Sequence, residues 1–593
     1  MIGPGRPGQK AAVLVGGAAS LVAGVYLLEA IRPALLLDPD PRWFVARFLL
    51  WIGLLSATAA AGCIAAAGFL MWTRSSFGRA EAGPLPLRRE TTALVCVLAL
   101  LAGLFLRAVW IETLPIPFLS DEVNLIGPSL ALTGQWRDFA NSIRPMPYGV
   151  PDPHEMIGVL YLRMFQESLA VFGTTVLGVR FLSFAGGALS LVTGTLLARA
   201  LLPSGGAALA AVVLAGLRWH LILSRSGWHS VVLFPLVDLA TLAVIASRRR
   251  RLPAAAALAG ALLGLGAHFY LAAWIAGAAL LVLCVWPGAT RGAARRGAQR
   301  LAFYVAGFFF VAAPLFLLRE ARSEGYFGRV SRHSVVAEMR YTRSYLPPFS
   351  VAARSLVAPW LLPDPEGWHD LPGRSRLGWI IGIPVAVAFA RALAFPREEL
   401  SGLLLVHAGV ALAAAVAGGL AGHPNGFRFG YLTTLTAVAA ASGFLQIVRW
   451  VPPARRRAAA VAAIGLAAVS GVTGGRDAIL RWPEHQATFD SFSGEDTLIG
   501  RAAARWERYG VVQVTDGLGR SDTTIDTVRR YRLDPFLASG GGGSSGAAQR
   551  DSRVFRIVDP RARPREGERQ VEVVRDGFGR DWAVVIGRLR SRT

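Results

Sequence analysis

Apolar runs of about 20 residues dominate the chain, and this pattern limits it to folds that a lipid bilayer accepts. Of its 593 residues, 53% are hydrophobic and 17% are charged. An α-helix rises about 1.5 Å per residue, so about 20 apolar residues cross the hydrocarbon core of a bilayer. A soluble protein of this length would carry more charge. The sequence therefore predicts a mainly α, polytopic membrane protein.

We expect about thirteen transmembrane helices. A helix satisfies all its backbone hydrogen bonds within one segment, which is why it suits a bilayer that contains no water. The predicted helices lie near residues 11–31, 48–73, 92–113, 180–201, 205–218, 229–247, 253–268, 270–287, 301–318, 377–394, 401–421, 428–449 and 457–473.

Arginine clusters orient these helices. They lie at 88–89, 248–251, 291–300 and 449–457. Positively charged loops stay on the cytoplasmic side of a membrane. With thirteen helices and the N-terminus inside, all four clusters fall on that side, an agreement that the helix count does not assume. Three long segments then face outward: 114–179, 319–376 and the tail from 474.

The net charge of +24 comes almost entirely from arginine, because Lys10 is the only lysine. Such a charge is compatible with a nucleic acid or anionic lipid as partner. It is equally produced by orientation signals in a genome that favours arginine codons. Since the arginines gather in short loops between apolar runs, we favour orientation signals and expect no nucleic acid partner. The expected location is a bacterial-type cytoplasmic (inner) membrane.

The chain divides into three predicted parts. Residues 1–91 hold two extra N-terminal transmembrane helices, and 92–473 form a transmembrane core with outer loops 114–179 and 319–376. The tail 474–593 is rich in charge and has short β-like runs after a helix-like stretch, which predicts a small extracytoplasmic α/β domain. These tail segments are 497–509 for the helix and 511–514, 554–558, 571–574 and 582–586 for the strands.

An acidic pair, Asp121 and Glu122, follows the hydrophobic run 92–113 on its outer side. In a catalytic interpretation Asp121 takes the proton from an attacking hydroxyl as general base, and Glu122 orients the substrate or coordinates a metal. The alternative is an ordinary solvated loop end, or the N-cap of a helix over 123–133.

The residues around this pair resemble a known family. The stretch Ser120-Asp-Glu-Val-Asn-Leu-Ile-Gly-Pro-Ser-Leu-Ala-Leu-Thr-Gly-Gln-Trp136 is similar to the first outer loop of GT-C glycosyltransferases. The branch it resembles includes protein O-mannosyltransferases and lipid A aminoarabinose transferases. The resemblance implies a GT-C fold and an inverting enzyme that takes a sugar from a polyprenyl phosphate carrier in the membrane.

Further motifs extend the resemblance over roughly 90–450. The stretch from Tyr161 to Gly173 resembles the family's interfacial helix and Phe-Gly turn, and Val179-Arg-Phe-Leu-Ser resembles the start of its second core helix. Trp219-His-Leu-Ile-Leu-Ser-Arg-Ser-Gly-Trp-His-Ser230 resembles a short outer loop between two core helices. The two helices before residue 91 depart from the family pattern.

A second acidic and imidazole cluster, Asp152, His154 and Glu155, lies on the same outer loop. Relatives often carry a His-Pro-Pro or Lys-Pro motif here, so no substrate-binding role transfers directly. A divalent cation, Mg²⁺ or Mn²⁺, could bridge these groups and the donor phosphate. A polar loop turned toward water explains the same residues, and the sequence does not decide between the two.

A departing polyprenyl phosphate needs fixed cations near the outer interface. Arg225 is the first candidate because it lies in the expected short outer loop, and His220 stands beside it. Arg428 precedes the helix 428–449, where family members often carry an arginine. Arg225 could instead be an arginine that reaches from a helix end to the interface.

The sequence thus predicts a membrane glycosyltransferase with Asp121 as general base, whose sugar and acceptor (protein, lipid or polysaccharide) stay open. A lipid or glycan transporter is the main rival class, and transporters place ionisable groups inside the membrane. Asp238 is the clearest such group here. A non-catalytic membrane scaffold whose tail binds a partner is the second rival.

Overall fold

The computed structural model divides into two units, Met1–Glu81 and Ala82–Thr593. All residues that the structure describes belong to the second unit, so the predicted helices 11–31 and 48–73 lie outside them. The described residues are 89–114, 122, 125–131, 145–147, 156–286, 293–317, 367, 370–417, 429–492, 494–507, 509, 511–515, 522–530, 554–566, 568–576 and 579–587.

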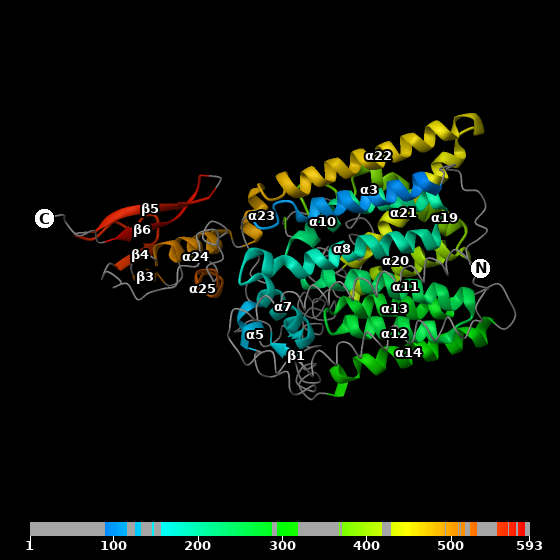
Figure 1. Cartoon of the computed structure of the whole chain (residues 1–593), viewed down its shortest axis with the longest axis horizontal. Helices are drawn as coiled ribbons and strands as arrows, with labels where there is room; N and C mark the ends of the chain where they lie inside the picture. The colour runs from blue at the N-terminus through cyan, green and yellow to red at the C-terminus, as the bar shows by residue number, and fades with distance from the viewer. Residues whose placement is uncertain are drawn as a thin grey trace, which may run out of the picture. The chain divides into compact units, whose positions relative to one another are not determined.

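Each predicted membrane helix from 92–113 onward coincides with a helix of the structure (Figure 1). The length of the apolar runs explains this agreement, because a continuous apolar segment of about 20 residues in a membrane has few alternatives to a helix. These helices are α3 (Arg89–Ala108), α8 (Val176–Leu201), α9 (Ser204–Gly216), α11 (Leu233–Arg250), α12 (Pro253–Ala267), α13 (Ala272–Val285), α14 (Ala293–Leu317), α19 (Gly378–Ala394), α20 (Glu399–Ala417), α21 (Thr433–Trp450) and α22 (Arg456–Arg476).

Among the described helices, five are long and apolar enough to cross a membrane, or up to seven if each bent pair forms one span. The bent pairs are α9 with α10 (Arg218–Arg225), at 51°, and α19 with α20, at 105°. The protein is therefore a mainly helical, multi-pass membrane protein. The count of thirteen spans and the orientation stay predictions.

Close backbone contact between small residues packs these helices, as is common where lipid surrounds a bundle. A Cβ atom added to Gly216 of α9 would lie 2.2 Å from the Cα atom of Gly471 in α22. One added to Gly260 of α12 would lie 2.0 Å from the carbonyl oxygen of Tyr304 in α14. Glycine is required at both positions because a side chain would drive the helices apart.

The segment 219–230 was expected to be a short outer loop, and this expectation is wrong for its first part, which is helical. Helix α9 ends at Gly216, the chain bends, and α10 continues with all eight of its residues buried. The reason is local: Arg-Trp-His-Leu-Ile-Leu-Ser-Arg has polar and apolar residues at helical spacing, so it forms a helix that buries its polar side chains against neighbouring helices. A short 3₁₀ helix, η2 (His229–Val232), links α10 to α11.

Shorter elements flank the long helices. The predicted interfacial stretch forms α7 (Val159–Phe172), which packs on α8 through buried residues such as Tyr161 and Phe165. The remaining elements of this part are α5 (Ile126–Ala131), the antiparallel pair β1 (Pro145–Pro147) and β2 (Met156–Gly158), η3 (Gly430–Leu432), η4 (Pro453–Arg455) and η5 (Asp477–Arg481).

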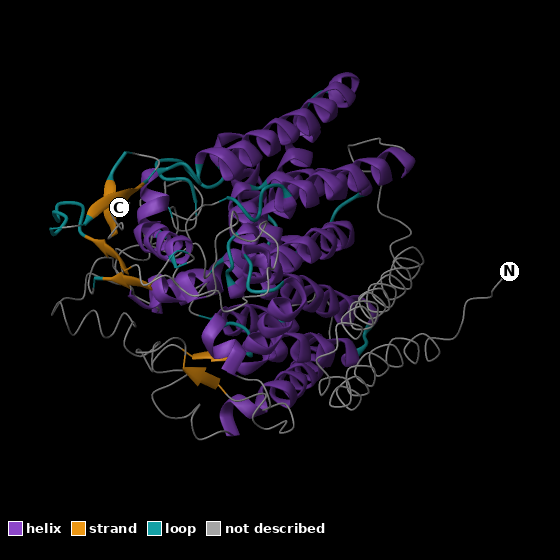
Figure 2. Cartoon of the chain, turned by 60° about the vertical axis from the view of Figure 1, so that its left-hand side comes forward, coloured by secondary structure: helices purple, strands orange, loops and turns teal. Residues whose placement is uncertain are grey.

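The predicted α/β character of the tail is confirmed (Figure 2). Its four-stranded mixed sheet has the order β3-β4-β6-β5, in which β3 and β4 are parallel and the other pairs antiparallel. Parallel neighbours need a crossover connection, and α25 lies between β3 and β4 in the chain. The elements are α23 (Gln486–Ser491), α24 (Gly494–Trp506), β3 (Val511–Val514), α25 (Asp522–Arg530), β4 (Val554–Val558), β5 (Arg569–Arg575) and β6 (Asp581–Gly587).

Candidate functional site

Glu122 of the acidic pair lies at the end of the bundle where α3 and α22 finish and α8 and α11 begin, which we call the acidic end. Its Oε1 accepts hydrogen bonds from Arg180 Nε, at 3.3 Å, and from the Gly227 backbone N–H. Both side chains of the ion pair are fully buried. Arg180 Nη1 also donates to the Ile111 carbonyl at 3.1 Å. Glu122 therefore ties together α8, the turn after α3 and the loop after α10.

Gly227 is needed for this contact. A Cβ atom at this position would lie 2.9 Å from Glu122 Cγ and 3.3 Å from the Val179 carbonyl oxygen. A larger residue would push the carboxylate away from the backbone N–H that it accepts from. The glycine therefore holds Glu122 at a fixed distance from the α10–η2 connection.

Arg225, a predicted phosphate ligand, is fully buried at the C-terminal end of α10. Its guanidinium donates to carbonyl groups at the end of α3, which have no partners inside their own helix. The positive charge also suits the negative end of the α3 dipole. The acceptors are the carbonyl oxygens of Leu106 at 2.9 Å, Arg107 at 3.2 Å, Val109 at 2.7 Å and Leu114 at 3.4 Å. A phosphate role stays a prediction, and it would require these bonds to be exchanged.

His220, the second predicted phosphate ligand, lies deeper, on the buried face of α10. Its Nδ1 is 2.9 Å from Arg107 Nη2 and 2.9 Å from Ser224 Oγ. Its Nε2 is 3.1 Å from Ser190 Oγ. Both ring nitrogens are thus engaged inside the bundle, and contact with a donor phosphate stays a prediction.

Three aromatic side chains contact one another near Glu122, and Tyr161 is the one that its charge influences. The ring centroids of Tyr161 and His229 are 5.7 Å apart, and those of His229 and Tyr270 are 5.0 Å apart. Burial raises the pKa of the Tyr161 phenol, and the negative charge of Glu122 raises it further. Tyr161 is therefore a neutral hydroxyl, and among the described residues its oxygen has no hydrogen-bond partner.

Several predicted site residues lie outside the described part of the chain: Asp121, Asp152, His154, Glu155 and Arg428. Within the part that is described, no group of three or more His, Cys, Asp or Glu side chains could hold a metal ion. The proposed divalent cation at 152–155 therefore stays a prediction. Glu122, Arg225 and His220 are the predicted site residues that the structure places, and α10 links all three.

A buried ion cluster at the start of α10 was missed by the sequence analysis. Arg218 Nε donates to Asp370 Oδ1 at 2.5 Å, and its Nη1 donates to Asp477 Oδ2 at 3.3 Å. Arg374 Nη1 donates to the same Asp477 oxygen at 2.6 Å. The partners of Arg218 are 152 and 259 residues away in the chain, so no local pattern announces them.

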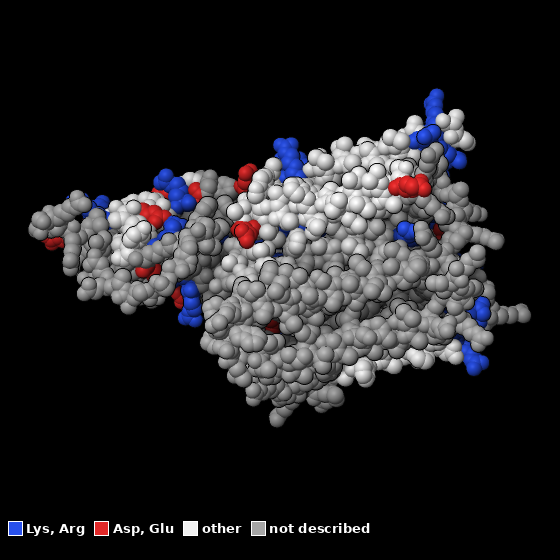
Figure 3. Space-filling view, in the orientation of Figure 1, with Lys and Arg blue, Asp and Glu red and all other residues white. Residues whose placement is uncertain are grey.

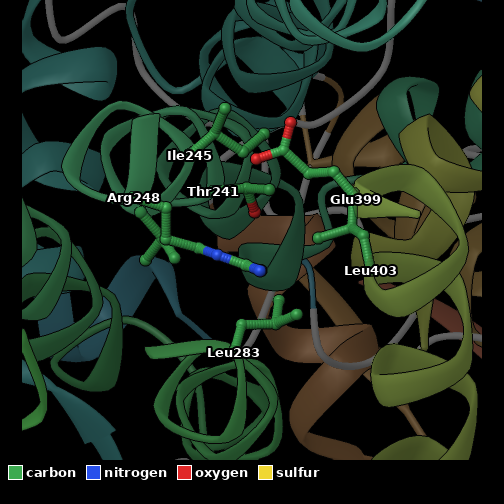
Figure 4. Close-up of a pocket in the computed structure, with 7 residues that line it drawn as sticks. Thr241, Ile245, Arg248, Leu283, Glu399 and Leu403 are labelled. Carbon is green, nitrogen blue, oxygen red and sulfur yellow. The ribbon is translucent and has the colours of Figure 1, made fainter. Parts of the chain in front are cut away.

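A separate cavity lies between α11, α13 and α20, in the half of α11 that is remote from the acidic end (Figure 4). The charged groups in its lining are Arg248 and Glu399. Glu399 accepts from Arg249 Nε at 2.7 Å. The cavity shares no lining residue with the Glu122 site, and it contains no carboxylate pair that could act on a hydroxyl.

Arginines gather at the end of the bundle that is remote from Glu122. Arginines occupy the first turns of α14 and α22 and the last turns of α11 and α21. Figure 3 shows basic side chains at the right-hand end of the helical part, where α3 and α22 begin. The acidic end is the opposite one. This division follows the arginine clusters from which the sequence orientation was predicted.

No protein-family model matches the chain, and no curated protein matches it in sequence. Solved structures with a similar arrangement exist. ArnT from Cupriavidus metallidurans in the apo state has 13% identity and a TM-score of 0.47, over 84% of this chain and 97% of that one. The same protein bound to undecaprenyl phosphate has 14% identity and a TM-score of 0.46, over 84% and 98%.

The archaeal oligosaccharyltransferase AglB from Archaeoglobus fulgidus, in complex with an inhibitory peptide and a dolichol-phosphate, is also similar. It has 15% identity and a TM-score of 0.39, over 78% of this chain and 69% of that one. At these identities and TM-scores the similarity concerns the overall arrangement, and no residue role is transferred from it.

Proposed function

We propose that this protein is an inverting membrane glycosyltransferase that moves a sugar from a polyprenyl-phosphate donor to an acceptor hydroxyl. The reaction takes place at the acidic end of the bundle, which faces outward in a topology of thirteen spans. Asp121 is the general base. The donor reaches the site by diffusion in the bilayer, which supplies an insoluble substrate where nucleotide sugars are absent.

The observation that carries this proposal is the burial of Glu122. Its carboxylate is held by Arg180 and by the Gly227 N–H, and it is fully shielded from water. This carboxylate is engaged with Arg180 and the Gly227 N–H, whereas a general base must be placed to contact the acceptor hydroxyl. We therefore assign different roles to the two neighbouring acids. Glu122 holds its segment against Arg180 and Gly227, and Asp121 acts on the acceptor.

The chemistry needs one base and a place for developing negative charge. Asp121 removes the acceptor proton as the hydroxyl oxygen attacks the anomeric carbon, and the bond to the phosphate oxygen breaks on the opposite face. Arg428 is the cation proposed for the leaving phosphate, with Arg225 and His220 as further candidates. A divalent cation at Asp152, His154 and Glu155 would add to the same charge stabilisation.

A transporter is the second candidate, and Asp238 is the observation that favours it. A buried carboxylate in a membrane helix often marks a transport path. Here, however, Asp238 accepts from Thr193 Oγ1 at 2.8 Å and from Thr434 Oγ1 at 3.2 Å, within a closed packing of helices. A buried carboxylate that accepts hydrogen bonds from side chains of two neighbouring helices supports a structural role more than ion passage.

The test compares Asp121→Asn with Glu122→Gln in the purified full-length protein, reconstituted in lipid with a labelled polyprenyl-phosphate sugar. We expect Asp121→Asn to keep the thermal stability and to lose at least about a hundredfold in turnover, the scale of a general base. Glu122→Gln should lower the melting temperature, since it removes the buried negative charge that Arg180 Nε contacts.

Glu112 provides the matched control, because it is an exposed carboxylate near the end of α3. Glu112→Gln should change neither stability nor turnover. Full turnover in Asp121→Asn would overturn the assignment of the base. Donor translocation across the vesicle membrane, without transfer in any variant, would favour the transporter.

A further inference from the structure

A chain of hydrogen bonds crosses the interior of the bundle, and His220 is its only member that is a candidate in the proposed reaction. It begins at Arg107 on α3, passes through His220 on α10 and Ser190 on α8, and ends at Asp238 on α11. The exposed fractions of these side chains are between 0% and 1%. The chain therefore joins two ionisable groups that water does not reach.

The direction of each hydrogen bond follows from the chemistry of the groups. Arg107 Nη2 lies 2.9 Å from His220 Nδ1, and a guanidinium can only donate, so Nδ1 is the acceptor and carries no proton. The proton of a neutral imidazole is then on Nε2. From there it points to Ser190 Oγ, at 3.1 Å.

Because Ser190 accepts from His220, its own hydroxyl proton is available to Asp238 Oδ2, at 3.5 Å. The same carboxylate oxygen accepts from Thr193 at 2.8 Å and from Thr434 of α21 at 3.2 Å. The bonds thus run in one direction, from the cation on α3 to the carboxylate on α11. Only one tautomer of His220 fits this order.

The charges at the two ends complement each other. Arg107 also donates to the carbonyl oxygens of Gly103 at 2.7 Å and Ala215 at 3.2 Å, which solvate the guanidinium but do not cancel its charge. In a bilayer an uncompensated charge is strongly unfavourable, whereas a bridged pair is neutral as a whole. We propose that Arg107 and Asp238 form one charge pair, bridged by His220 and Ser190. This pair positions α10 next to Glu122.

The consequence for the site follows from what α10 carries, and here the inference rests on the proposed function. Beyond His220, Arg225 binds the carbonyl groups at the end of α3, and Gly227 donates to Glu122. A shift of α10 would move both contacts. Arg107, His220 and Asp238 are therefore positioning residues, which act on the chemistry through α10 and not through contact with the substrate.

A double-mutant cycle on thermal stability tests the charge pair. Asp238→Asn should lower the melting temperature of the full-length protein by several degrees, since arginine cannot lose its charge. Arg107→Met should lower it less, because an aspartic acid can take up a proton. The double variant Arg107→Met/Asp238→Asn should be more stable than the sum of the two losses predicts.

Thr241 supplies the matched control for the cycle. It is a buried hydroxyl on α11, one turn from Asp238, and it donates to the Val237 carbonyl of its own helix at 2.8 Å. Thr241→Val combined with Arg107→Met should lower the melting temperature by the sum of the two single losses. Thr241→Val alone should transfer sugar at the normal rate. Additive losses for the Arg107 and Asp238 pair as well would overturn the charge pair.

Variants at His220 test the bridge and separate it from a phosphate ligand. Glutamine can accept from Arg107 and donate to Ser190, whereas leucine can do neither. We expect His220→Gln to keep more of the melting temperature and of kcat than His220→Leu, with KM for the donor little changed in both. Equal loss in the two variants would overturn the bridge, and a raised donor KM in both would make His220 a donor ligand instead.

The stability cycle needs no turnover, so the two proposals fail separately. A protein that transfers no sugar can still show non-additive losses of melting temperature for the Arg107 and Asp238 variants. An active transferase with uncoupled variants would lose only the positioning inference. If a single variant does not accumulate in the membrane, the His220 comparison still decides the question.

Discussion

The helical bundle and the tail domain both contain arginine–carboxylate ion pairs, and among these are a fully buried pair in the bundle and an exposed pair in the tail. In the bundle, Glu122 and Arg180 are both 0% exposed. In the tail, Arg575 and Asp581 are 57% and 40% exposed. Water can replace a lost partner in the tail, but it cannot do so in the bundle. The same arginine–carboxylate contact is therefore expendable in one region and essential in the other.

The difference has an energetic scale. Removing one partner of a buried pair typically costs about 3–5 kcal/mol, because the remaining charge is left without water. An exposed pair contributes about 0–1 kcal/mol. A stability map of this protein should accordingly depend on the burial of each pair and not on the number of pairs. Three substitutions test this contrast at decreasing size.

The largest effect is expected for Arg218→Met. The change removes the buried arginine that pairs with both Asp370 and Asp477, so the free energy of unfolding should fall by about 3–5 kcal/mol. Arg374 provides the control, since it contacts the same Asp477 but is 49% exposed. Thermal unfolding of the purified protein in detergent measures both variants. A loss as large in Arg374→Met as in Arg218→Met would break the comparison.

An intermediate effect is expected for Arg580 of the tail. Its guanidinium lies 5.6 Å from the Phe489 ring centroid and 4.9 Å from that of Trp582, and it donates to Asp490 at 2.8 Å. It also pairs with the buried Asp576 at 2.6 Å, and because Arg580 itself is 31% exposed, we expect an effect between those of an exposed pair and a fully buried pair. Arg580→Ala should therefore speed hydrogen exchange in β6 of the full-length protein.

Arg580→Lys sharpens this prediction, because lysine keeps the charge but not the planar stacking surface. It should give an exchange rate between those of the wild type and the alanine variant. Unchanged exchange in both variants would show that the contact of α23 with the β5–β6 connection does not depend on Arg580.

The smallest effect is expected for Glu568, and it depends on pH. Hydrogen bonds from Arg556, at 2.5 Å and 3.1 Å, lower the pKa of the Glu568 carboxyl, and the Arg565 N–H lowers it further. A depressed folded-state pKa stabilises the domain above the ordinary glutamate value of about 4.3 and ceases to do so as the pH falls.

Glu568→Gln should therefore cost less than about 1 kcal/mol at neutral pH and nothing in acid. Hydrogen exchange of β4 and β5, compared between wild type and variant across this pH range, checks the sign. A difference that grows toward low pH would contradict the ion pair as its cause.

Local pattern was sufficient for most of the fold. The predicted strands 511–514 and 554–558 coincide with β3 and β4, because alternating β-branched residues between turns favour strands. The helix-like stretch 497–509 is shifted from α24 by three residues, within the ordinary error of a helix boundary. Apolar length alone located the long helices.

The site could not be derived in the same way. Glu122 was singled out from its neighbour and its position, but its partner Arg180 is 58 residues away and no periodicity connects them. Arg225 was assigned to a loop because the apolar run was expected to end at residue 218. The bend after α9 instead continues the chain as a buried helix, which uses the arginine to cap α3. Such bends depend on long-range packing.

The cluster at Arg218 also has a consequence for how the protein is made. Synthesis runs from the N-terminus, so Arg218 reaches the membrane long before its partner Asp477, which is encoded 259 residues later. Gly216 of α9 likewise packs against Gly471 of α22, which is synthesised much later. A chain cut short before α22 would keep the Arg218–Asp370 pair but would lack Asp477, and the face of α9 at Gly216 would have no α22 to pack on. The last long helix therefore completes contacts that the earlier helices of the bundle cannot make by themselves.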